Sequence, residues 1–592
     1  MSEKSLKSRF NKKNVLSGII LSVALSLTVF FFSPIDIFLA NQIDFVIGFD
    51  LVVLAMSITS LVAIALFTCF FMLCLLIKET FFYIMRNIFF GVLCAMYFQM
   101  MFYNGRMQTL TGDSSVYIYM NDKVYYYTNY AIYFIIICVP FIVWSLKEIY
   151  PNVKPFSKIS KQTTSFICLA LIVMQLVGSV SMVFNYGIRK VSKDEYVGVL
   201  SYDEAMKLSD NENIVVFLTD RLDSLWLDES IEEYPETKEI LDGFTFYQNN
   251  VSTYTNTFPA VAELLTGNKY EGQLNSEYLT KAWHSENIMN TFYENDYRIN
   301  LLLDSLTTYN SYNDIKEFTS TYTTVTSGYK INYLGGRGIV STITCFSLMK
   351  LGPYALKELI ADQFGPNFSN DFFEILDKKD YYADTAISGS SDINFYNYLK
   401  NHGLNTESDR KTFNFIHLNF AHNVSYELSE LGDKFDPKNM GADVSSTIRG
   451  GFEILNEYFE QMKELGIYDS STIIILGDHG HPPYATEAGE DRLDDVIVTA
   501  LLIKEANAEH APLKIDKDTE LSNSFFCASI LDYAGIDHSQ YGCSYSDVIN
   551  ENLHMPRTLN VYNFRVSQPE LVCKYNITGD ARDFNNWEYV KP

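Results

Sequence analysis

Apolar positions are distributed very unevenly along the 592-residue chain, which divides into two parts. Long apolar runs dominate the first 185 residues, and shorter apolar runs separated by polar residues follow. Five of the long runs approach or exceed the roughly 20 residues that a helix needs to cross a bilayer. They are Val15–Phe32, Leu51–Ile77, Asn87–Tyr103, Tyr130–Leu146 and Ser165–Phe184. We therefore predict a five-helix transmembrane domain over residues 1–185.

The positive charges between these runs predict their orientation. Lys and Arg gather in the N-terminal tail and in the second and fourth loops, whereas the alternate loops carry only Arg106 and Lys123. Positively charged loops stay in the cytoplasm. The first run is too long for a signal peptide and is followed by four others, so we expect it to remain uncleaved. The prediction is a multi-pass cell-membrane protein with a cytoplasmic N-terminus and an extracellular C-terminal part.

The pattern after residue 185 is typical of an α/β protein. A polar connector is expected over 186–210, followed by short runs rich in β-branched residues that suit buried strands. These runs are Asn213–Thr219, Thr412–Phe420, Thr472–Leu476 and Val496–Ile503. Helical patterns lie between them at Thr257–Leu265, Glu286–Asn295 and Gly450–Leu465. Alternating strands and helices predict an α/β domain over 211–540 with a mainly parallel central sheet. Residues 541–592 are expected to form a C-terminal cap.

One apolar segment, Ser347–Ala361, interrupts this alternation. It suits an inserted core or lid helix of the α/β domain. It also suits a helix near the membrane face that guides a lipid. The sequence leaves both interpretations open.

Charge and cysteine content narrow the function. The net charge of −26 argues against nucleic acid as a partner, because binding phosphate backbones requires clustered Lys and Arg. Five of the nine cysteines lie in the apolar runs, and no CxxC spacing occurs, so a thiolate zinc site is not expected. A disulfide between Cys543 and Cys573 is left open.

Acidic and histidine residues follow two of the predicted strands. Asp220 comes directly after Asn213–Thr219, and Asp478 and His479 follow Thr472–Leu476 in the sequence TIIILGDHG. Carboxyl ends of parallel strands meet at one edge of a sheet, where ligands bind. Carboxylate and imidazole groups are good ligands for a divalent metal. A polar turn after each strand is the simpler alternative for either position alone.

Two further positions are candidates for contact with a substrate. Thr257 begins the segment TFPAVAELLTG, where it either caps a helix or presents a hydroxyl at the positive helix end. His417 falls within the predicted strand Thr412–Phe420 and is expected to be buried and structural. His422 lies beyond that strand and is expected to contact substrate.

Together these residues resemble the alkaline-phosphatase superfamily, in its sulfatase-like branch, over about residues 211–540. Thr257, Pro259, Thr266 and Gly267 fall on the spacing of the sulfatase nucleophile motif. The resemblance implies that Asp220, Thr257, Asp478 and His479 bind a metal, that Thr257 is the nucleophile, and that His422 faces the substrate. Manganese is the metal expected first, with magnesium or zinc as alternatives.

One difference from sulfatases changes the expected reaction. Sulfatases convert a Cys or Ser to formylglycine and carry an Arg shortly after it, whereas this chain has Thr257 and Val261. The Thr and the five spans look like the lipoteichoic acid synthase and lipid phosphoethanolamine transferase group. Phe32–Phe45 and Gly579–Trp587 resemble its Gram-positive phosphoglycerol transferases.

The resemblance therefore implies a metal-dependent transferase. It would move a phosphoglycerol or related phospho-alcohol group from a membrane phospholipid, with phosphatidylglycerol as the expected donor, to a surface glycan or polymer. A phospho-threonine intermediate is implied. The alternatives are a phosphate or sulfate ester hydrolase and a non-catalytic membrane binding or regulatory protein.

Several nearby residues have weaker assignments. Asp223 and His481 would suit a second metal, although both are more simply polar loop residues. Arg221, Arg337 and Arg492 are candidate phosphate contacts, with surface ion pairing as the alternative.

Overall fold

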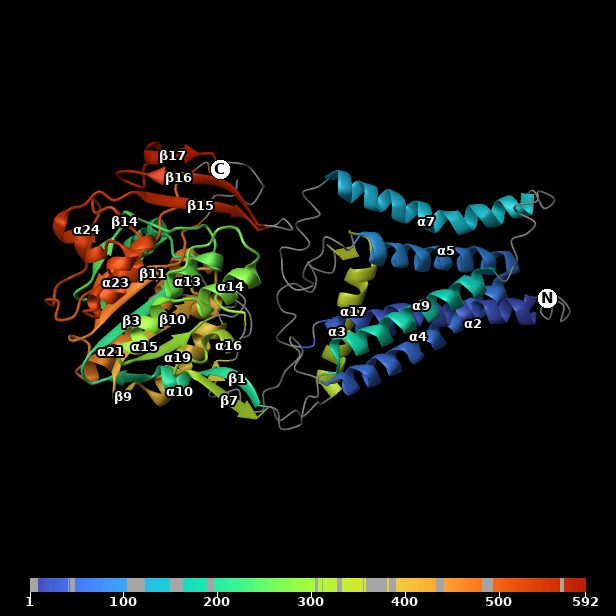
Figure 1. The fold of residues 1–592 in the computed structure, drawn as a ribbon, viewed down its shortest axis with the longest axis horizontal. Coiled ribbons are helices and arrows are strands. Elements are labelled where there is room, and N and C mark those ends of the chain that lie inside the picture. Colours follow the sequence, from blue (N-terminus) through green and yellow to red (C-terminus); the bar gives the residue numbers. More distant parts are fainter. Residues whose placement is uncertain are drawn as a thin grey trace. The chain divides into compact units, whose positions relative to one another are not determined.

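A computed structural model describes most of the chain: residues 9–40, 42, 48–103, 123–149, 163–188, 196–303, 307–310, 312–326, 333–354, 356–357, 381–382, 390–432, 441–481, 493, 495–564 and 569–591. The contacts within the chain divide it into two units (Figure 1). The first consists of residues 1–195 and 327–376, and the second of residues 196–326 and 377–592.

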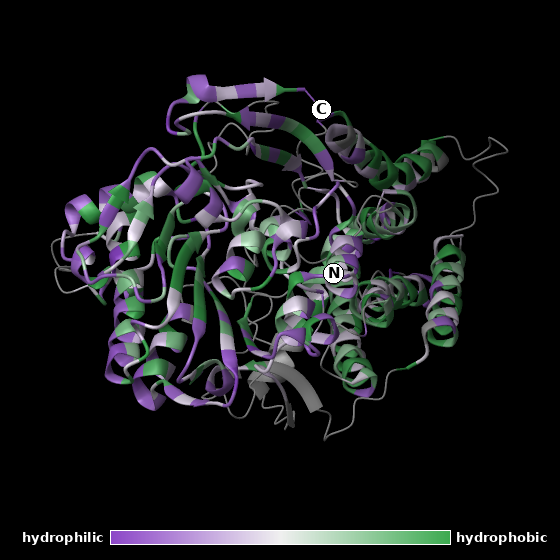
Figure 2. Cartoon of the chain, turned by 60° about the vertical axis from the view of Figure 1, so that its left-hand side comes forward, coloured by the Kyte–Doolittle hydropathy of each residue, from purple (hydrophilic) through white to green (hydrophobic). Residues whose placement is uncertain are grey.

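The first unit contains the five predicted membrane helices. Five helices are long and apolar enough to cross a membrane, at Lys12–Ala40, Phe49–Ile77, Glu79–Tyr103, Tyr126–Leu146 and Thr163–Asn185. Their elements are α2 (Lys12–Leu27), η1 (Thr28–Phe32), α3 (Ser33–Ala40), α4 (Phe49–Ile77), α5 (Glu79–Phe98), η2 (Gln99–Tyr103), α7 (Lys123–Ile149) and α9 (Thr163–Tyr186). These helices are mostly coloured as hydrophobic in Figure 2. The prediction of five long apolar helices is confirmed.

A sixth long helix of this unit, α17 (Tyr333–Leu351), comes from the middle of the sequence and packs against α3, α4, η1 and η2. Ser347 Oγ donates a hydrogen bond to the Val29 carbonyl in η1, at 2.5 Å. The Tyr354 hydroxyl donates to the Tyr103 carbonyl in η2, at 3.3 Å. Both η1 and η2 are π-helical turns, which interrupt the regular hydrogen-bond ladder of a helix. The apolar segment that the sequence left ambiguous therefore begins within the membrane-helix unit.

An ion pair joins α17 to the first membrane helix. Lys350 Nζ lies 3.7 Å from Asp36 Oδ2, and Ser179 Oγ of α9 donates to Asp36 Oδ1 at 2.8 Å. Both charged side chains are about one-fifth exposed. An ion pair with little exposure leaves an uncompensated charge when one partner is removed.

We expect Asp36→Asn to lower the free energy of unfolding by about 1–3 kcal/mol, because Lys350 then loses its partner. Thermal unfolding in detergent measures this change. The exchange Asp36→Lys with Lys350→Asp should recover most of the loss, and Asp50→Asn at the start of α4 serves as the control. Equal melting temperatures for Asp36→Asn and wild type would contradict the stabilising role of the pair.

The second unit is built around a seven-stranded sheet in the order β13-β4-β12-β11-β3-β10-β6. The strands are β3 (Asn213–Thr219), β4 (Thr245–Tyr247), β6 (Tyr297–Leu302), β10 (Lys411–Leu418), β11 (Thr472–Gly477), β12 (Leu501–Lys504) and β13 (Lys514–Asp516). Four consecutive strands, β11, β3, β10 and β6, are parallel to one another. All seven residues of β3 are buried, as expected for a strand covered on both faces. The predicted α/β class with a mainly parallel sheet is confirmed.

Helices and small sheets surround this sheet (Figure 1). The helices are α10 (Tyr202–Ala205), α11 (Ser224–Glu233), α12 (Thr237–Ile240), α13 (Thr257–Thr266), α14 (Asn275–His284), α15 (Ile288–Glu294), α16 (Tyr312–Ile315), α19 (Ser390–His402), α20 (Tyr426–Ser429), α21 (Val444–Glu464), α23 (Phe526–Tyr533) and α24 (Tyr545–Glu551). The short strands are β1 (Tyr196–Ser201), β2 (Lys207–Ser209), β5 (Asn250–Val251), β7 (Tyr322–Thr326), β8 (Tyr381–Tyr382), β9 (Asn405–Ser408) and β14 (Leu521–Ser522). Within the predicted connector 186–210, the structure thus has β1, α10 and β2.

The strand expected at Val496–Ile503 differs from the prediction. Only Leu501–Lys504 forms β12, and β12 is antiparallel to β11. Ile497 and Val498 leave the sheet and join a separate apolar cluster with side chains of the C-terminal strands. An apolar run can be buried either as a strand of the central sheet or in a separate apolar cluster. Its composition alone therefore did not distinguish these two environments.

The C-terminal residues form an antiparallel sheet of β15 (Arg557–Asn563), β16 (Glu570–Ile577) and β17 (Trp587–Val590). Arg557 is buried, and its Nη1 donates to the Asn249 backbone carbonyl at 2.9 Å. In the Gly579–Trp587 segment, the Ala581 amide donates to Asn249 Oδ1 at 2.9 Å. These bonds link the sheet to the segment between β4 and β5. Cys543 and Cys573 form no disulfide bond with each other.

Candidate metal centre

Three predicted site residues meet at the carboxyl end of the parallel sheet. Asp220 directly follows β3, and Asp478 and His479 directly follow the neighbouring strand β11. Their possible ligand atoms all lie within 4.8 Å of one another, and all three residues are buried. The parallel pairing of β3 and β11 accounts for this, because it brings the ends of both strands to the same edge.

The hydrogen bonds of His479 leave one ring nitrogen for a ligand. Its Nδ1 lies 2.7 Å from the Gly480 carbonyl, so Nδ1 carries the proton and donates. Nε2 then has its lone pair available and faces Asp220 Oδ1 at 3.8 Å and Asp478 Oδ2 at 3.7 Å. A second hydrogen bond that fixes the tautomer is usual for metal-binding histidines.

The residues present fit a divalent cation. Asp478 is fully buried, and its Oδ1 accepts from the Arg221 and His479 backbone amides at 2.8 Å each. Its Oδ2 is buried without a hydrogen-bond partner among the described residues. An unsatisfied buried carboxylate oxygen is costly, and a bound cation would compensate it. Two carboxylates and one imidazole suit manganese, magnesium or zinc.

Thr257 is positioned beside this group at the start of α13. Its Oγ1 donates to Asp220 Oδ2 at 3.2 Å. Phe258 has extended rather than helical torsion angles, so the regular turns of α13 begin at Pro259. The Thr257 hydroxyl therefore points towards the carboxylate cluster, and no capping bond from it to the helix occurs among the described residues.

Two histidines of the β10 region also lie near the cluster. His417 is buried, as predicted, but its Nε2 is 4.0 Å from Asp220 Oδ2, a proximity that its strand position did not reveal. His422 lies beyond β10, where its Nδ1 accepts from Asn423 Nδ2 at 2.7 Å. Burial, followed by the nearby charges of Arg221 and His479, lowers the pKa of His422 to about 4. His422 is therefore neutral near pH 7.

The structure shows other contacts for Asp223 and His481, the two candidates for a second metal site. Asp223 caps α11 by accepting from the Leu225 amide at 2.8 Å, and its Oδ2 accepts from the His481 amide at 3.0 Å. Burial raises the pKa of Asp223 to about 7. Among the described residues, the group of three or more metal-type ligands consists of Asp220, Asp478 and His479, and Asp223 and His481 are not part of it. The Arg337 side chain and Arg492 lie outside the described residues.

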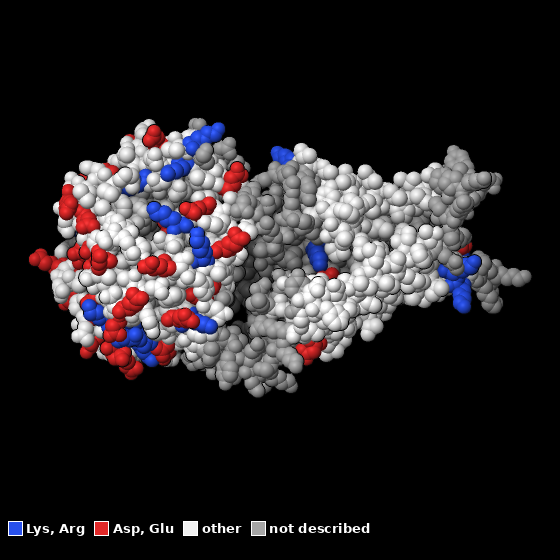
Figure 3. All heavy atoms as spheres, in the orientation of Figure 1, with Lys and Arg blue, Asp and Glu red and all other residues white. Residues whose placement is uncertain are grey.

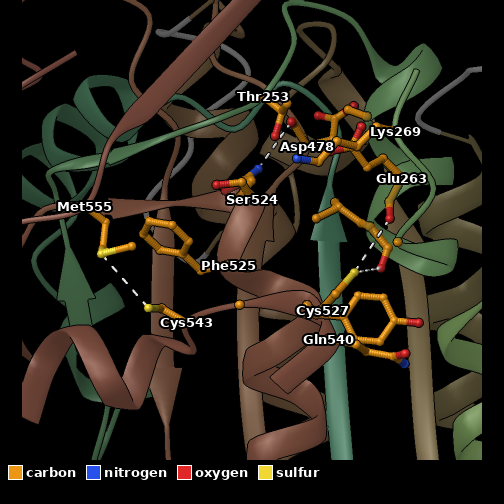
Figure 4. A pocket seen from close by; sticks show the side chains of 16 residues that line it. Thr253, Glu263, Lys269, Asp478, Ser524, Phe525, Cys527, Gln540, Cys543 and Met555 are labelled. Carbon is orange, nitrogen blue, oxygen red and sulfur yellow. Dashed lines mark hydrogen bonds between the residues drawn. The ribbon is translucent and has the colours of Figure 1, made fainter. Parts of the chain in front are cut away.

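Two cavities adjoin the candidate centre. One of about 320 Å³ reaches Asp478 and is lined by α13 and by the segment that begins α23 (Figure 4). Its walls combine polar side chains such as Glu263 and Ser524 with apolar ones such as Phe525 and Met555. Its volume is in the range of small-molecule pockets. The other cavity, of about 230 Å³, is lined by Arg221, Trp226, His422 and His481 among others. Trp226 could not be selected from a sequence pattern, because only the turn from β3 into α11 brings it to this cavity.

No family model matches the chain, and no curated protein matches it. Solved structures are similar to it. The lipoteichoic acid synthase LtaP from Listeria monocytogenes is 12% identical, with a TM-score of 0.34, over 66% of this chain and 86% of that chain. A protein in the alkaline phosphatase superfamily from Vibrio parahaemolyticus is 11% identical, with a TM-score of 0.35, over 68% and 85%. The C-terminal periplasmic domain of EcEptC from Escherichia coli is 11% identical, with a TM-score of 0.30, over 57% and 87%. At these identities, the similarity to the alkaline phosphatase superfamily protein, to LtaP and to EcEptC is a similarity of fold alone.

Proposed function

We propose that this protein is a membrane-anchored, metal-dependent transferase of phosphoglycerol or a related phospho-alcohol group. The observation that carries the proposal is the hydrogen bond from Thr257 Oγ1 to Asp220 within a buried cluster of metal-type donors. A hydroxyl in that position has an acceptor for its proton and can become a nucleophile. Thr257 cannot form formylglycine, which disfavours sulfate ester hydrolysis.

The reaction would proceed in two displacements. In the first, Thr257 Oγ1 forms a bond to the phosphorus of the lipid donor, for which we propose phosphatidylglycerol, and the bond to the diacylglycerol oxygen breaks. Diacylglycerol leaves with a proton, and a phosphoglycerol group remains on Thr257. In the second, an acceptor hydroxyl attacks the phosphorus, loses its proton, and Thr257 regains its hydroxyl.

The residues around Thr257 have separate tasks in this scheme. Asp220, Asp478 and His479 would hold the divalent metal with Thr257, and we expect manganese before magnesium or zinc. When bound, the metal supplies positive charge that lowers the pKa of the Thr257 hydroxyl. His422, neutral near pH 7, would stabilise the phosphoryl oxygens or assist proton transfer.

The proposed localisation follows from the charges of the loops. Five spans with a cytoplasmic N-terminus would leave the second unit outside the cell. There is no ATP outside the cell, so the transferred group must come from an already activated donor. A membrane phospholipid meets that requirement, and a surface glycan or polymer is the acceptor we propose.

Mass spectrometry of the purified, metal-loaded chain incubated with phosphatidylglycerol tests this function. We expect a phosphoglycerol adduct on the peptide that contains Thr257, and no adduct on the Thr257→Ala variant. Release of free glycerophosphate with no transfer to any added polyol or glycan would instead support a hydrolase. The absence of both adduct and turnover in the metal-loaded wild type would support a non-catalytic protein.

A further inference from the structure

The cavity of about 230 Å³ contains a cation that the proposed reaction does not yet use. Its lining includes Arg221, Trp226, His422, Asn423, Thr447 and His481. Two of these residues are close in sequence to proposed metal ligands, because Arg221 follows Asp220 directly and His481 follows His479 by two positions. A third, His422, is the proposed substrate contact. The cavity is therefore lined by neighbours of the proposed metal site, and Asp220, Thr257, Asp478 and His479 themselves do not line it.

Arg221 is held in one orientation by contacts at both ends. Its backbone amide donates to Asp478 Oδ1 at 2.8 Å, and its φ of 62° lies in the left-handed region. At the other end, its guanidinium carbon lies 5.8 Å from the centroid of the Trp226 ring. Its Nη2 is 2.5 Å from His481 Nδ1. The Trp226 and His481 rings pack together, with centroids 4.4 Å apart. A guanidinium held in this way loses little side-chain entropy when it binds a ligand.

The charge of Arg221 has no acidic partner among the described residues, and its Nε is buried without a hydrogen bond there. Four other arginines of the second unit pair with carboxylates: Arg298 with Glu204, Arg449 with Glu453, Arg557 with Glu520, and Arg582 with Asp580. Acidic side chains are abundant on the face of this unit seen in Figure 3. Arg298, Arg449 and Arg557 also have a buried Nε without a hydrogen bond, so Arg221 differs from them in lacking a carboxylate partner among the described residues. In so acidic a chain, a guanidinium without such a partner favours binding of an external anion.

His422 also presents a donor at this cavity. The His422 Nδ1 accepts from Asn423, so the proton of the neutral ring is on Nε2. The His481 Nδ1 contacts Arg221 Nη2, so this ring helps to hold the guanidinium. Thr447 Oγ1 already donates to the Asp443 carbonyl at 2.7 Å and accepts from the Ser425 amide at 3.1 Å. The Arg221 guanidinium and the His422 imidazole N–H match the oxygen atoms of a tetrahedral anion.

We propose that this cavity binds a phosphate oxyanion of the substrate, with Arg221 as its charged contact and with Trp226 and His481 as the residues that position Arg221. This inference extends the proposed function. The identity of the bound phosphate depends on that proposed function. That phosphate is either the reacting diester of the lipid donor or a phosphate group carried by the acceptor. The chemistry of recognition is the same for both.

Isothermal titration of the purified, metal-loaded full chain with inorganic phosphate tests the cavity. We expect Arg221→Gln to weaken binding by about tenfold, as expected for loss of a charged hydrogen bond. Arg221→Lys should lose less, because it keeps the charge but not the planar donor fork. The matched control is Arg410→Gln, which removes a guanidinium that is about one-third exposed and pairs with Asp296 and Asp409.

The variants separate a binding role from a structural one. Every Arg221 variant keeps the backbone amide that donates to Asp478, so metal content and melting temperature should stay at wild-type values. Trp226→Phe should keep phosphate affinity, and Trp226→Ala should weaken it about threefold, because a flat aromatic ring is needed to hold the guanidinium. Unchanged phosphate affinity in Arg221→Gln, with metal retained, would overturn the proposal.

Single-turnover measurements then distinguish the two sources of phosphate. Slower adduct formation on Thr257 in Arg221→Gln would assign the contact to the lipid diester. Normal adduct formation with slower discharge to glycerol phosphate, supplied as a phosphate-bearing acceptor, would assign it to the acceptor. Normal rates for both steps would count against the proposal. If the wild type forms no adduct at all, the proposed function fails, while the phosphate titration still decides the role of the cavity.

Discussion

Replacing Thr257 with alanine is expected to reduce phospho-group transfer by about 10³–10⁶-fold, the range typical of losing a covalent nucleophile. The reason is geometric, since Thr257 Oγ1 is the hydroxyl that donates to Asp220 in the carboxylate cluster. Thr257→Ser should retain measurable transfer, because it keeps a hydroxyl at the same position. Turnover of a fluorescent phosphatidylglycerol analogue by the purified chain measures both variants.

A neighbouring threonine provides the control for this prediction. Thr255 is buried two residues earlier, and its Oγ1 donates to Asn256 rather than to the cluster. Thr255→Ala should therefore keep most of the activity. Thr257→Ala removes one hydrogen bond and should change the free energy of unfolding by only about 1 kcal/mol. If Thr257→Ala retained wild-type turnover, Thr257 would not be the nucleophile and the double displacement would be wrong.

The second large effect is expected for Asp478→Asn, which should abolish both metal binding and transfer. The amide is nearly the same size as the carboxylate, and its oxygen still accepts from the Arg221 and His479 amides. What it lacks is the negative charge at the buried Oδ2, which has no hydrogen-bond partner in the described part of the chain. A metal site deprived of one carboxylate loses its main electrostatic attraction for a divalent ion.

Elemental analysis of the purified variants measures this loss directly. We expect wild type and Asp210→Asn, an exposed control, to retain stoichiometric metal and Asp478→Asn to retain little. Treatment of wild type with a chelator should abolish transfer, and added manganese should restore it. Full metal content in Asp478→Asn would show that the cation binds elsewhere.

Much of the fold was accessible from the sequence because local patterns determine it. The five long apolar runs were sufficient for five spans, since a bilayer-spanning helix must satisfy its own backbone. The run Asn213–Thr219 coincides with β3, whose residues are all buried. Asp220, Asp478 and His479 follow the ends of β3 and β11, and parallel pairing made their convergence predictable.

Other features depended on contacts between distant residues. Ile497 and Val498 form part of an apolar run, but the C-terminal strands, rather than the central sheet, bury them. The proximity of His417 to Asp220 follows from the register of β10 against β3, which pairs His417 with Leu218. Neither the register nor the choice between two apolar partners is encoded in a local pattern.

The proposed catalytic site likewise depends partly on local sequence patterns and partly on tertiary contacts. The sequence by itself determined that a hydroxyl, two carboxylates and an imidazole belong to strand ends and a helix start. Only the tertiary structure decided that Thr257 donates to Asp220, that α17 packs with the membrane helices, and that Arg221 lies over Trp226 without an acidic partner among the described residues. The physical reason is that periodicity and turn chemistry act over a few residues, whereas hydrogen bonds, ion pairs and cavities arise where segments far apart in the chain meet.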